Sequence, residues 1–344
     1  MDERKTTVSR LTYLMFLESY ATRLNGIGRY GAAKNLRCAT NRLQAFLAAI
    51  GKRDISFQKL KPDFIDRFEE WLRMQGVQRN TSSSYMRSLH AAFNMALREG
   101  WAVGGRSTVC ENPFVNVYCG VDKTAKRAVG KACIRSIQQL NIPLKLADVN
   151  RRDGKRAYGK YWENTLRHLE LTRDLFIFSF CMRGMAFVDM AFLRKSDISE
   201  GHVRYARRKT HQHIVVRLEP MMLTIIERWH TDGSYVFPII TEEHDVAIAY
   251  RQYQNKLTLY NRHLKTLGQL LGGIRLTSYV SRHSWASTAH AENVPLSIIS
   301  QSMGHDSERT TRIYLQELDT AVLDRTNSLL LGAVFEGKKK RIAY

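Results

Sequence analysis

Apolar side chains recur at helical spacing in three groups within the first hundred residues, at positions 11–17, 36–50 and 64–72. Glycine or proline separates these groups, namely Gly26, Gly28, Gly51, Pro62 and Gly76. A fourth helix is predicted over about 81–99, with Asn80 or Thr81 as its N-cap and Gly100 as its stop. We therefore expect residues 1–103 to form a compact helical domain.

The helical pattern lapses between residues 104 and 131, where Pro113 and four glycines interrupt the chain. Three basic residues lie in the same stretch, at Lys123, Lys126 and Arg127. This composition predicts a linker between the helical domain and a second domain of residues 132–344.

The second half of the chain mixes both kinds of pattern. Long apolar-periodic segments cover 164–193, 220–230 and 246–268, the first of them broken near Arg183 and Gly184. Two strand-like runs, 202–205 and 214–218, are joined by a basic turn. The expected fold is mainly α-helical with a small antiparallel β-sheet, built as a helical N-terminal domain followed by an α+β domain.

The charge of the chain narrows the class of partner. Its 344 residues include 53 Lys and Arg against 32 Asp and Glu, a formal net charge of +21 that is spread along the chain. Each phosphate that a basic protein neutralises releases counterions, so a nucleic acid is the expected partner. A ribosomal or membrane-surface protein without chemistry is the alternative that charge alone leaves open.

Other compositional features argue against secretion and metal binding. The five cysteines contain no C-x-x-C pair, which is typical of reduced thiols rather than of a disulfide frame or zinc site. His211 and His213 could bind a metal, but no third ligand has suitable spacing, so no metal or cofactor is expected. Without a signal peptide or a run of about 18 apolar residues, the protein is expected in the cytoplasm and away from membranes.

Candidate chemistry concentrates between residues 276 and 318. Arg282 precedes the pair Gly304–His305, and Tyr314 follows His305 by nine residues. This order resembles the C-terminal half of the active site of tyrosine recombinases, the phage integrase family. The resemblance covers nearly the whole chain and implies a helical core-binding (SAM-like) domain, a linker and a catalytic domain.

The resemblance gives these residues roles that fit the needs of DNA cleavage. Tyr314 would be the nucleophile; a phenol of pKa near 10 needs help to ionise, and a phosphorane-like transition state needs cationic and hydrogen-bonding groups. Arg282 and His305 would supply that stabilisation. Lys209 matches the hairpin lysine that protonates the leaving 5′ oxygen, although in a basic turn it could simply grip a phosphate. Arg207, Arg208, Lys123, Lys126 and Arg127 are expected to contact DNA.

Two positions depart from the family pattern. Tyr279 stands where the H-x-x-R motif keeps its histidine, three residues before Arg282. The family's first arginine belongs at Ala186, and Arg183, three residues earlier, is our candidate replacement, because residues three apart share a helical face. Arg173 and Arg194 would be the next choices.

Each residue also has a structural interpretation. A lone tyrosine on an amphipathic helix is usually a packing residue, and Tyr279 is a rival nucleophile to Tyr314. It is the order of Arg282, His305 and Tyr314 together that favours catalysis. Beyond Tyr314, the apolar segment 321–335 is expected to dock on a neighbouring protomer or to pack on its own domain.

The implied activity is site-specific cleavage and rejoining of double-stranded DNA through a 3′-phosphotyrosyl intermediate, in a homo-tetramer and without metal or ATP. Because the first helix starts near Met1, a simple recombinase acting on short core sites is expected, whether for integration, excision or inversion. A type IB topoisomerase and a catalytically silent DNA-binding protein are the alternatives.

Overall fold

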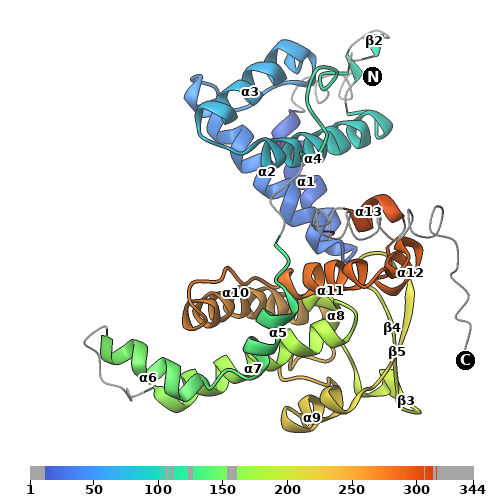
Figure 1. Ribbon diagram of the computed structural model, residues 1–344. Helices are drawn as coiled ribbons and strands as arrows, with labels where there is room; N and C mark the ends of the chain where they lie inside the picture. The colour runs from blue at the N-terminus through green and yellow to red at the C-terminus, as the bar shows by residue number, and fades with distance from the viewer. Residues whose placement is uncertain are drawn as a thin grey trace, which may run out of the picture. The chain divides into compact units, whose positions relative to one another are not determined.

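The computed structural model describes residues 12–101, 103–104, 108–109, 112–122, 127–152, 161–305, 307–312 and 315 (Figure 1). The chain divides into two compact units, Met1–Thr124 and Ala125–Tyr344. The division falls inside the segment 104–131 that the sequence marks as a linker.

The described part of the first unit contains four α-helices. In chain order its elements are α1 (Tyr13–Gly26), α2 (Tyr30–Ala49), the short 3-10 helix η2 (Phe57–Lys59), α3 (Pro62–Met74), α4 (Arg79–Arg98), β1 (Val103–Gly104) and β2 (Thr108–Val109). Their inward faces share one aromatic core, in which the Tyr13 hydroxyl donates to the carbonyl of Leu89 at 2.7 Å. The four helices lie where the apolar periodicity predicts them.

The start of α4 differs from the expectation. Its N-cap is Gln78, whose carbonyl accepts from the backbone N–H of Thr81 and Ser82, so the helix begins before the predicted caps. The Asn80 side chain is engaged elsewhere, because its amide donates to the carbonyl of Asp122 at 3.1 Å and accepts from the N–H of Asp122 at 2.7 Å. Asn80, which holds a distant segment, was therefore mistaken for a capping residue.

The two ends of the predicted linker pack on different units. Phe114 is 3% exposed within the core of the first unit, and Ser83 donates to the carbonyl of Gly120 at 2.6 Å. Val129 instead donates its N–H to the Ser284 hydroxyl at 2.9 Å, within the second unit. The residues that connect the two folded units are thus fewer than the sequence suggests.

The second unit combines helices with a three-stranded sheet. Its elements are α5 (Lys131–Gln138), α6 (Ile142–Arg152), α7 (Trp162–Cys181), α8 (Phe187–Ala191), η3 (Lys195–Asp197), β3 (Ile198–Ser199), β4 (His202–Ala206), β5 (His213–Arg217), α9 (Pro220–Arg228), α10 (Val246–Leu270), α11 (Val280–Ala291), α12 (Leu296–Ser302) and α13 (Glu308–Arg312). The strands are antiparallel in the order β3-β4-β5. The predicted fold class, mainly α with a small antiparallel sheet, is confirmed.

Strand register places one side of the β4–β5 hairpin in the core. Val203 pairs with Val216 and Tyr205 with Ile214, and all four side chains are buried. Alternate residues face outward, as the two-residue period of a strand requires. Packing of these side chains therefore fixes which face of the β4–β5 hairpin is buried.

A sharp turn between α7 and α8 brings two distant segments together. Arg183 has φ 56° and Gly184 has φ 74°, both in the left-handed region. A Cβ atom at Gly184 would lie 2.8 Å from the Cα of Arg282, so only glycine allows this approach. The predicted break in the apolar segment is thus the place where Gly184 packs against Arg282 of α11.

Several expectations fall outside the described residues. They concern Tyr314, Lys123, Lys126 and the segment 321–335. Among the helices that are described, none combines the length and apolarity needed to cross a bilayer.

Candidate active site

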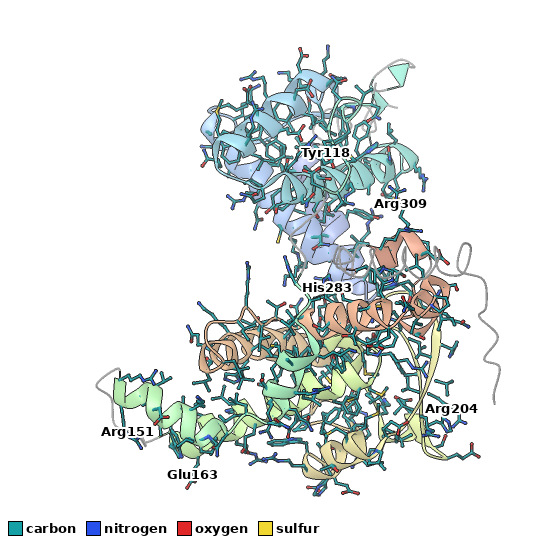
Figure 2. All side chains as sticks on the ribbon, viewed as in Figure 1. Tyr118, Arg151, Glu163, Arg204, His283 and Arg309 are labelled. Atoms are coloured by element: carbon teal, nitrogen blue, oxygen red, sulfur yellow. The ribbon has the colours of Figure 1, made fainter. Side chains whose placement is uncertain are left out.

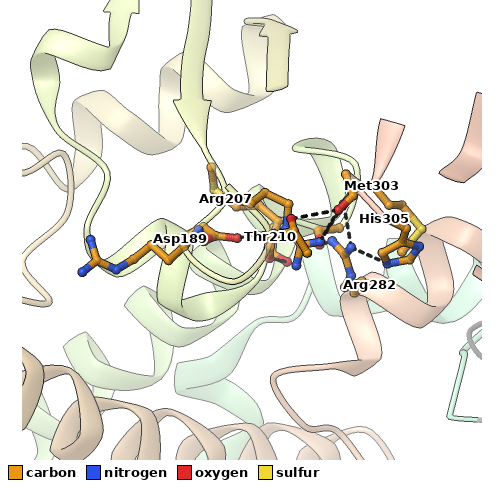
Figure 3. Close-up of polar contacts among 11 residues, drawn as sticks. Asp189, Arg207, Thr210, Arg282, Met303 and His305 are labelled. Atoms are coloured by element: carbon orange, nitrogen blue, oxygen red, sulfur yellow. Dashed lines mark hydrogen bonds and ion pairs between the residues drawn. The ribbon is translucent and has the colours of Figure 1, made fainter. Parts of the chain in front are cut away.

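Arg282 lies at the centre of the site, on α11, with 2% of its surface exposed (Figure 3). Its Nη1 donates to the carbonyl of Gly184 at 2.6 Å, and its Nη2 donates to the carbonyl of Met303 at 2.7 Å. Nη2 also lies 2.7 Å from Nε2 of His305. One guanidinium therefore joins the α7–α8 turn to the end of α12.

His305 follows the turn that ends α12. Gly304 has φ 62°, and the N–H of His305 donates to the carbonyl of Ser300, a glycine-dependent helix ending. The His305 ring is held between two partners, since Nδ1 lies 2.8 Å from the hydroxyl of Thr311. A guanidinium can only donate, so Nε2 accepts from Arg282 and Nδ1 carries the proton.

The surroundings of His305 keep its imidazole neutral. Burial is the largest cause and lowers its pKa to about 3, with further lowering by the positive charges of Arg282, Arg207 and Lys209. At neutral pH the ring is thus an uncharged hydrogen-bonding group. It is a weak base, in part because it lies among three cations.

We expect His305 to show no titration near its ordinary pKa of 6.5. In ¹⁵N NMR spectra its imidazole should remain in the neutral Nδ1–H form down to about pH 4, because charging it means desolvating a cation beside others. The unfolded chain takes up that proton below pH 6.5, so stability should fall as pH drops from 6.5 towards 3. His305→Gln should reduce this slope, and a midpoint near pH 6.5 in the folded protein would contradict the assignment.

Arg207 is a buried side chain directly after β4. Its side chain is 7% exposed, and Nη1 donates to the carbonyls of Gly304 at 2.7 Å and Met303 at 3.1 Å. Its Nε faces the carboxylate of Asp189 at 3.5 Å. These contacts bury Arg207 among protein groups, and its expected contact with DNA stays a prediction.

Asp189, on α8, completes this buried pair. Its second carboxylate oxygen accepts from the backbone N–H of Arg208 at 2.9 Å. The hydroxyl of Thr210 donates to the carbonyl of Gly304 at 3.2 Å. The turn between β4 and β5 is therefore held against both α8 and the Gly304–His305 turn.

The hairpin turn presents two exposed cations. Lys209 is exposed, and its charge is among those that lower the pKa of His305. Arg208 is also exposed, with its guanidinium carbon 3.8 Å from the centroid of the Phe192 ring. The structure thus keeps Lys209 within electrostatic range of the buried site while leaving it open to a ligand.

Arg183 lies in the same electrostatic neighbourhood as Arg282. Burial raises the pKa of the Tyr205 phenol, and Arg282, Arg207 and Arg183 each offset part of that rise. The side chain of Arg183 is half-buried. All three guanidinium groups therefore lower the pKa of the same buried tyrosine on β4.

The two fallback arginines are engaged elsewhere. Arg173 pairs with Asp174 at 2.9 Å and donates to the carbonyl of Leu140 at 3.3 Å. Arg194 lies with its guanidinium carbon 5.3 Å from the centroid of the Tyr235 ring. Of the three candidate arginines, Arg183 is the one whose positive charge lowers the pKa of Tyr205.

Tyr279 and Arg127 occupy more open positions. Tyr279 is 48% exposed and immediately precedes α11. Arg127 is exposed in the segment before α5.

Sequence reasoning missed Thr311 and the role of Asp189 towards Arg207. Thr311 is fully buried against His305, yet a threonine in a polar helix carries no distinctive sequence signal. Thr311 follows His305 by six residues, and this spacing was the available sequence clue to their contact. Across the described ranges, no cluster of three or more His, Cys, Asp or Glu side chains could hold a metal ion.

Two family models match the chain. The model for a phage integrase SAM-like domain matches residues 12–104, and the model for the phage integrase family matches residues 166–320. Together they span most of the chain, one in each unit. The chain belongs to the phage integrase family, the tyrosine recombinases.

Solved structures of integrases share this fold. A lambda integrase dimer bound to a COC′ core site has a TM-score of 0.55 at 14% identity, over 86% of this chain and 95% of that chain. The Tn1549 transposon integrase in complex with circular intermediate DNA has a TM-score of 0.53 at 14% identity, over 92% and 99%. A lambda integrase tetramer bound to a Holliday junction has a TM-score of 0.51 at 14% identity, over 89% and 78%.

No curated protein sequence matches this chain. At the identities of the solved structures, the likeness concerns the fold alone.

Proposed function

We propose that this protein is a site-specific tyrosine recombinase that cleaves and rejoins DNA through a 3′-phosphotyrosyl intermediate. The observation that carries the proposal is the buried Arg282–His305 pair, with Thr311 on its far side. Tyr314 follows Thr311 by three residues in the sequence. The proposed nucleophile therefore comes soon after a residue that contacts His305.

The cations around the site favour the two anionic species of the reaction. Tyr314 must approach a phenolate to attack phosphorus, and nearby positive charges lower the cost of that ionisation. The non-bridging phosphate oxygens gain charge in the transition state, and Arg282 and Arg183 are the groups that we assign to them. His305, which is neutral, serves as a hydrogen-bonding group there.

Lys209 is the proposed acid. Cleavage releases a 5′ oxygen that needs a proton, and an exposed lysine on a turn can reach it. The turn is held in place by Arg207 and Thr210, so the position of Lys209 relative to His305 is fixed by the fold. The 5′ hydroxyl can then attack the phosphotyrosyl bond of the partner strand, and no ATP is required.

Arg183→Ala is expected to lower the rate of strand cleavage by roughly 10²- to 10³-fold, the usual cost of removing one transition-state donor. The rate of covalent-complex formation on a cognate site measures this. Arg194→Ala serves as the matched control, because its guanidinium lies over Tyr235. Cleavage by Arg183→Ala at the wild-type rate would show that another group fills this role.

Contacts to DNA are assigned to four basic residues. Arg208, Arg127, Lys123 and Lys126 are proposed to bind backbone phosphates, which position a duplex without reading its sequence. We propose assembly as a homo-tetramer on specific core sites, with the segment 321–335 docking between protomers, in the cytoplasm. The arrangement of those sites then determines integration, excision or inversion.

A nicked suicide duplex tests the proposal. Cleavage next to the nick releases a short fragment, so the covalent complex cannot religate and accumulates. The wild-type protein is expected to form an adduct that survives denaturation. Failure to form it on a bound cognate site would leave a DNA-binding protein, and relaxation of supercoils without recombinant product would indicate a topoisomerase.

A further inference from the structure

Thr311 is the buried side chain of a short and otherwise polar helix. It lies on α13, where the charged side chains of Glu308, Arg309 and Arg312 are exposed (Figure 2). The Thr311 side chain is fully buried, and its hydroxyl lies 2.8 Å from Nδ1 of His305. A buried hydroxyl needs a hydrogen-bond partner, and His305 supplies one. Thr311 therefore links α13 to the candidate site.

The two ring nitrogens of His305 face groups of different chemistry. Nε2 lies 2.7 Å from Nη2 of Arg282, and a guanidinium can only donate (Figure 3). Nδ1 faces the hydroxyl of Thr311, which can both donate and accept. In this arrangement Nε2 accepts from Arg282, and Nδ1 donates its proton to the Thr311 oxygen.

This arrangement does not yet suit the proposed cleavage reaction, on which the inference rests. The phosphate oxygens that gain charge are assigned to Arg282, so Nε2 is the ring nitrogen on their side. An Nε2 without a proton would oppose such an oxygen, whereas an Nε2–H would donate to it. Burial and the neighbouring positive charges lower the pKa of His305 to about 3, so charging the whole ring is costly. A change of tautomer supplies the Nε2 proton without that cost.

We infer that Thr311 is a positioning residue that lets His305 change tautomer when a phosphate binds. Its hydroxyl accepts from Nδ1–H in the arrangement above and donates to Nδ1 once Nε2 carries the proton. A carbonyl or a carboxylate in its place could only accept and would hold the ring as Nδ1–H. An apolar side chain would leave a buried Nδ1 without a partner in either tautomer. A hydroxyl satisfies Nδ1 in both.

The change of tautomer conserves protons and charge. Nδ1 releases one proton to water and Nε2 takes one proton from water, so the ring is neutral before and after. The Thr311 hydroxyl keeps its own hydrogen and turns from acceptor to donor. Nη2 of Arg282 keeps its bond to the carbonyl of Met303, and the N–H that pointed at Nε2 becomes available to the phosphate. Thr311 thus acts on the phosphate through His305.

Rates of adduct formation on a nicked suicide duplex test the inference, with a core site that this protein has selected from random-sequence DNA. Thr311→Val keeps the branched shape and removes the hydroxyl. It should slow adduct formation at saturating DNA by roughly 10- to 100-fold, because a buried ring nitrogen loses its partner, and should leave DNA affinity unchanged. Thr311→Ser restores the hydroxyl and should cleave close to the wild-type rate.

Thr310→Val is the matched control. It makes the same chemical change one position earlier on α13, where the hydroxyl lies 3.3 Å from that of Ser307. This variant should cleave as the wild type does.

The ¹⁵N NMR spectrum of the His305 imidazole gives a readout that a purely structural role would not move. The free protein should show the neutral Nδ1–H tautomer. The Tyr314→Phe variant, which lacks the proposed nucleophilic oxygen, should show the neutral Nε2–H tautomer when it is bound to an intact duplex with the same core site.

Cleavage by Thr311→Val at the wild-type rate would overturn the inference. A Thr311→Ser variant as slow as Thr311→Val would do the same, because packing and not the hydroxyl would then matter. An Nδ1–H tautomer or an imidazolium in the DNA complex would also refute it, since Thr311 would remain an acceptor in both. Failure of the proposed function looks different, because the wild-type protein itself would then form no adduct on a bound core site, and the inference would fall with it.

Discussion

Tyr314→Phe is expected to abolish the covalent protein–DNA adduct while leaving DNA affinity unchanged. The substitution removes one oxygen, the atom that would form the bond to phosphorus, and leaves the aromatic ring and all cationic groups in place. No other group can substitute in kind, so the loss should reach the detection limit. Adduct formation on a nicked suicide duplex and a parallel binding assay measure the two quantities.

Tyr279→Phe is the matched control for this experiment. Tyr279 is 48% exposed and precedes Arg282 by three residues, where the family pattern keeps a phosphate-binding group. This variant should still form the adduct. The reverse result, with Tyr279→Phe inactive and Tyr314→Phe active, would transfer the nucleophile to Tyr279 and require a different geometry around Arg282.

Arg207→Ala is expected to lower the free energy of unfolding by about 3 kcal/mol, the typical cost of removing one partner from a buried ion pair. Asp189 would remain buried without its cation, and the carbonyls of Met303 and Gly304 would each lose one of two donors, keeping Arg282 and Thr210 respectively. Because those carbonyls flank His305, cleavage should also slow. Chemical denaturation followed by circular dichroism measures the stability change.

Arg208→Ala provides the neighbouring control. Arg208 is exposed over the Phe192 ring, an interaction of about 0.5 to 1 kcal/mol at such sites, so its removal should change stability little. Asp189→Asn in the Arg207→Ala background should restore part of the lost stability, because the isolated buried charge disappears. Wild-type stability of Arg207→Ala, together with weaker and less salt-dependent DNA binding, would return Arg207 to the DNA interface.

Periodicity in the sequence was sufficient for most of the elements. The four helices of the first unit, the β4–β5 hairpin and the break at Arg183–Gly184 follow from apolar spacing and from glycine positions. The start of α4 did not, because Asn80 has a tertiary partner, Asp122, that local pattern cannot reveal. Local signals identify elements better than they identify which polar side chain serves a remote segment.

In the candidate site, too, the sequence predicted some residues and missed the remote partners of others. Arg282 and His305 were found from motif order, and the structure brings them within 2.7 Å of each other. The burial of Arg207 was not foreseen, because a basic hairpin turn is usually solvated and nothing in its sequence marks an arginine that turns inward. Its burial depends on Asp189, eighteen residues earlier, and on carbonyls nearly a hundred residues later.

The hydrogen bonds of Arg282 have a thermodynamic consequence for substrate binding. In the protein alone, its guanidinium donates to carbonyls on two separate turns, at Gly184 and Met303. These bonds, with the contact to His305, fix the plane of the guanidinium before any phosphate binds. A phosphate that binds Arg282 therefore meets a side chain that is already ordered, and less conformational entropy is lost on binding.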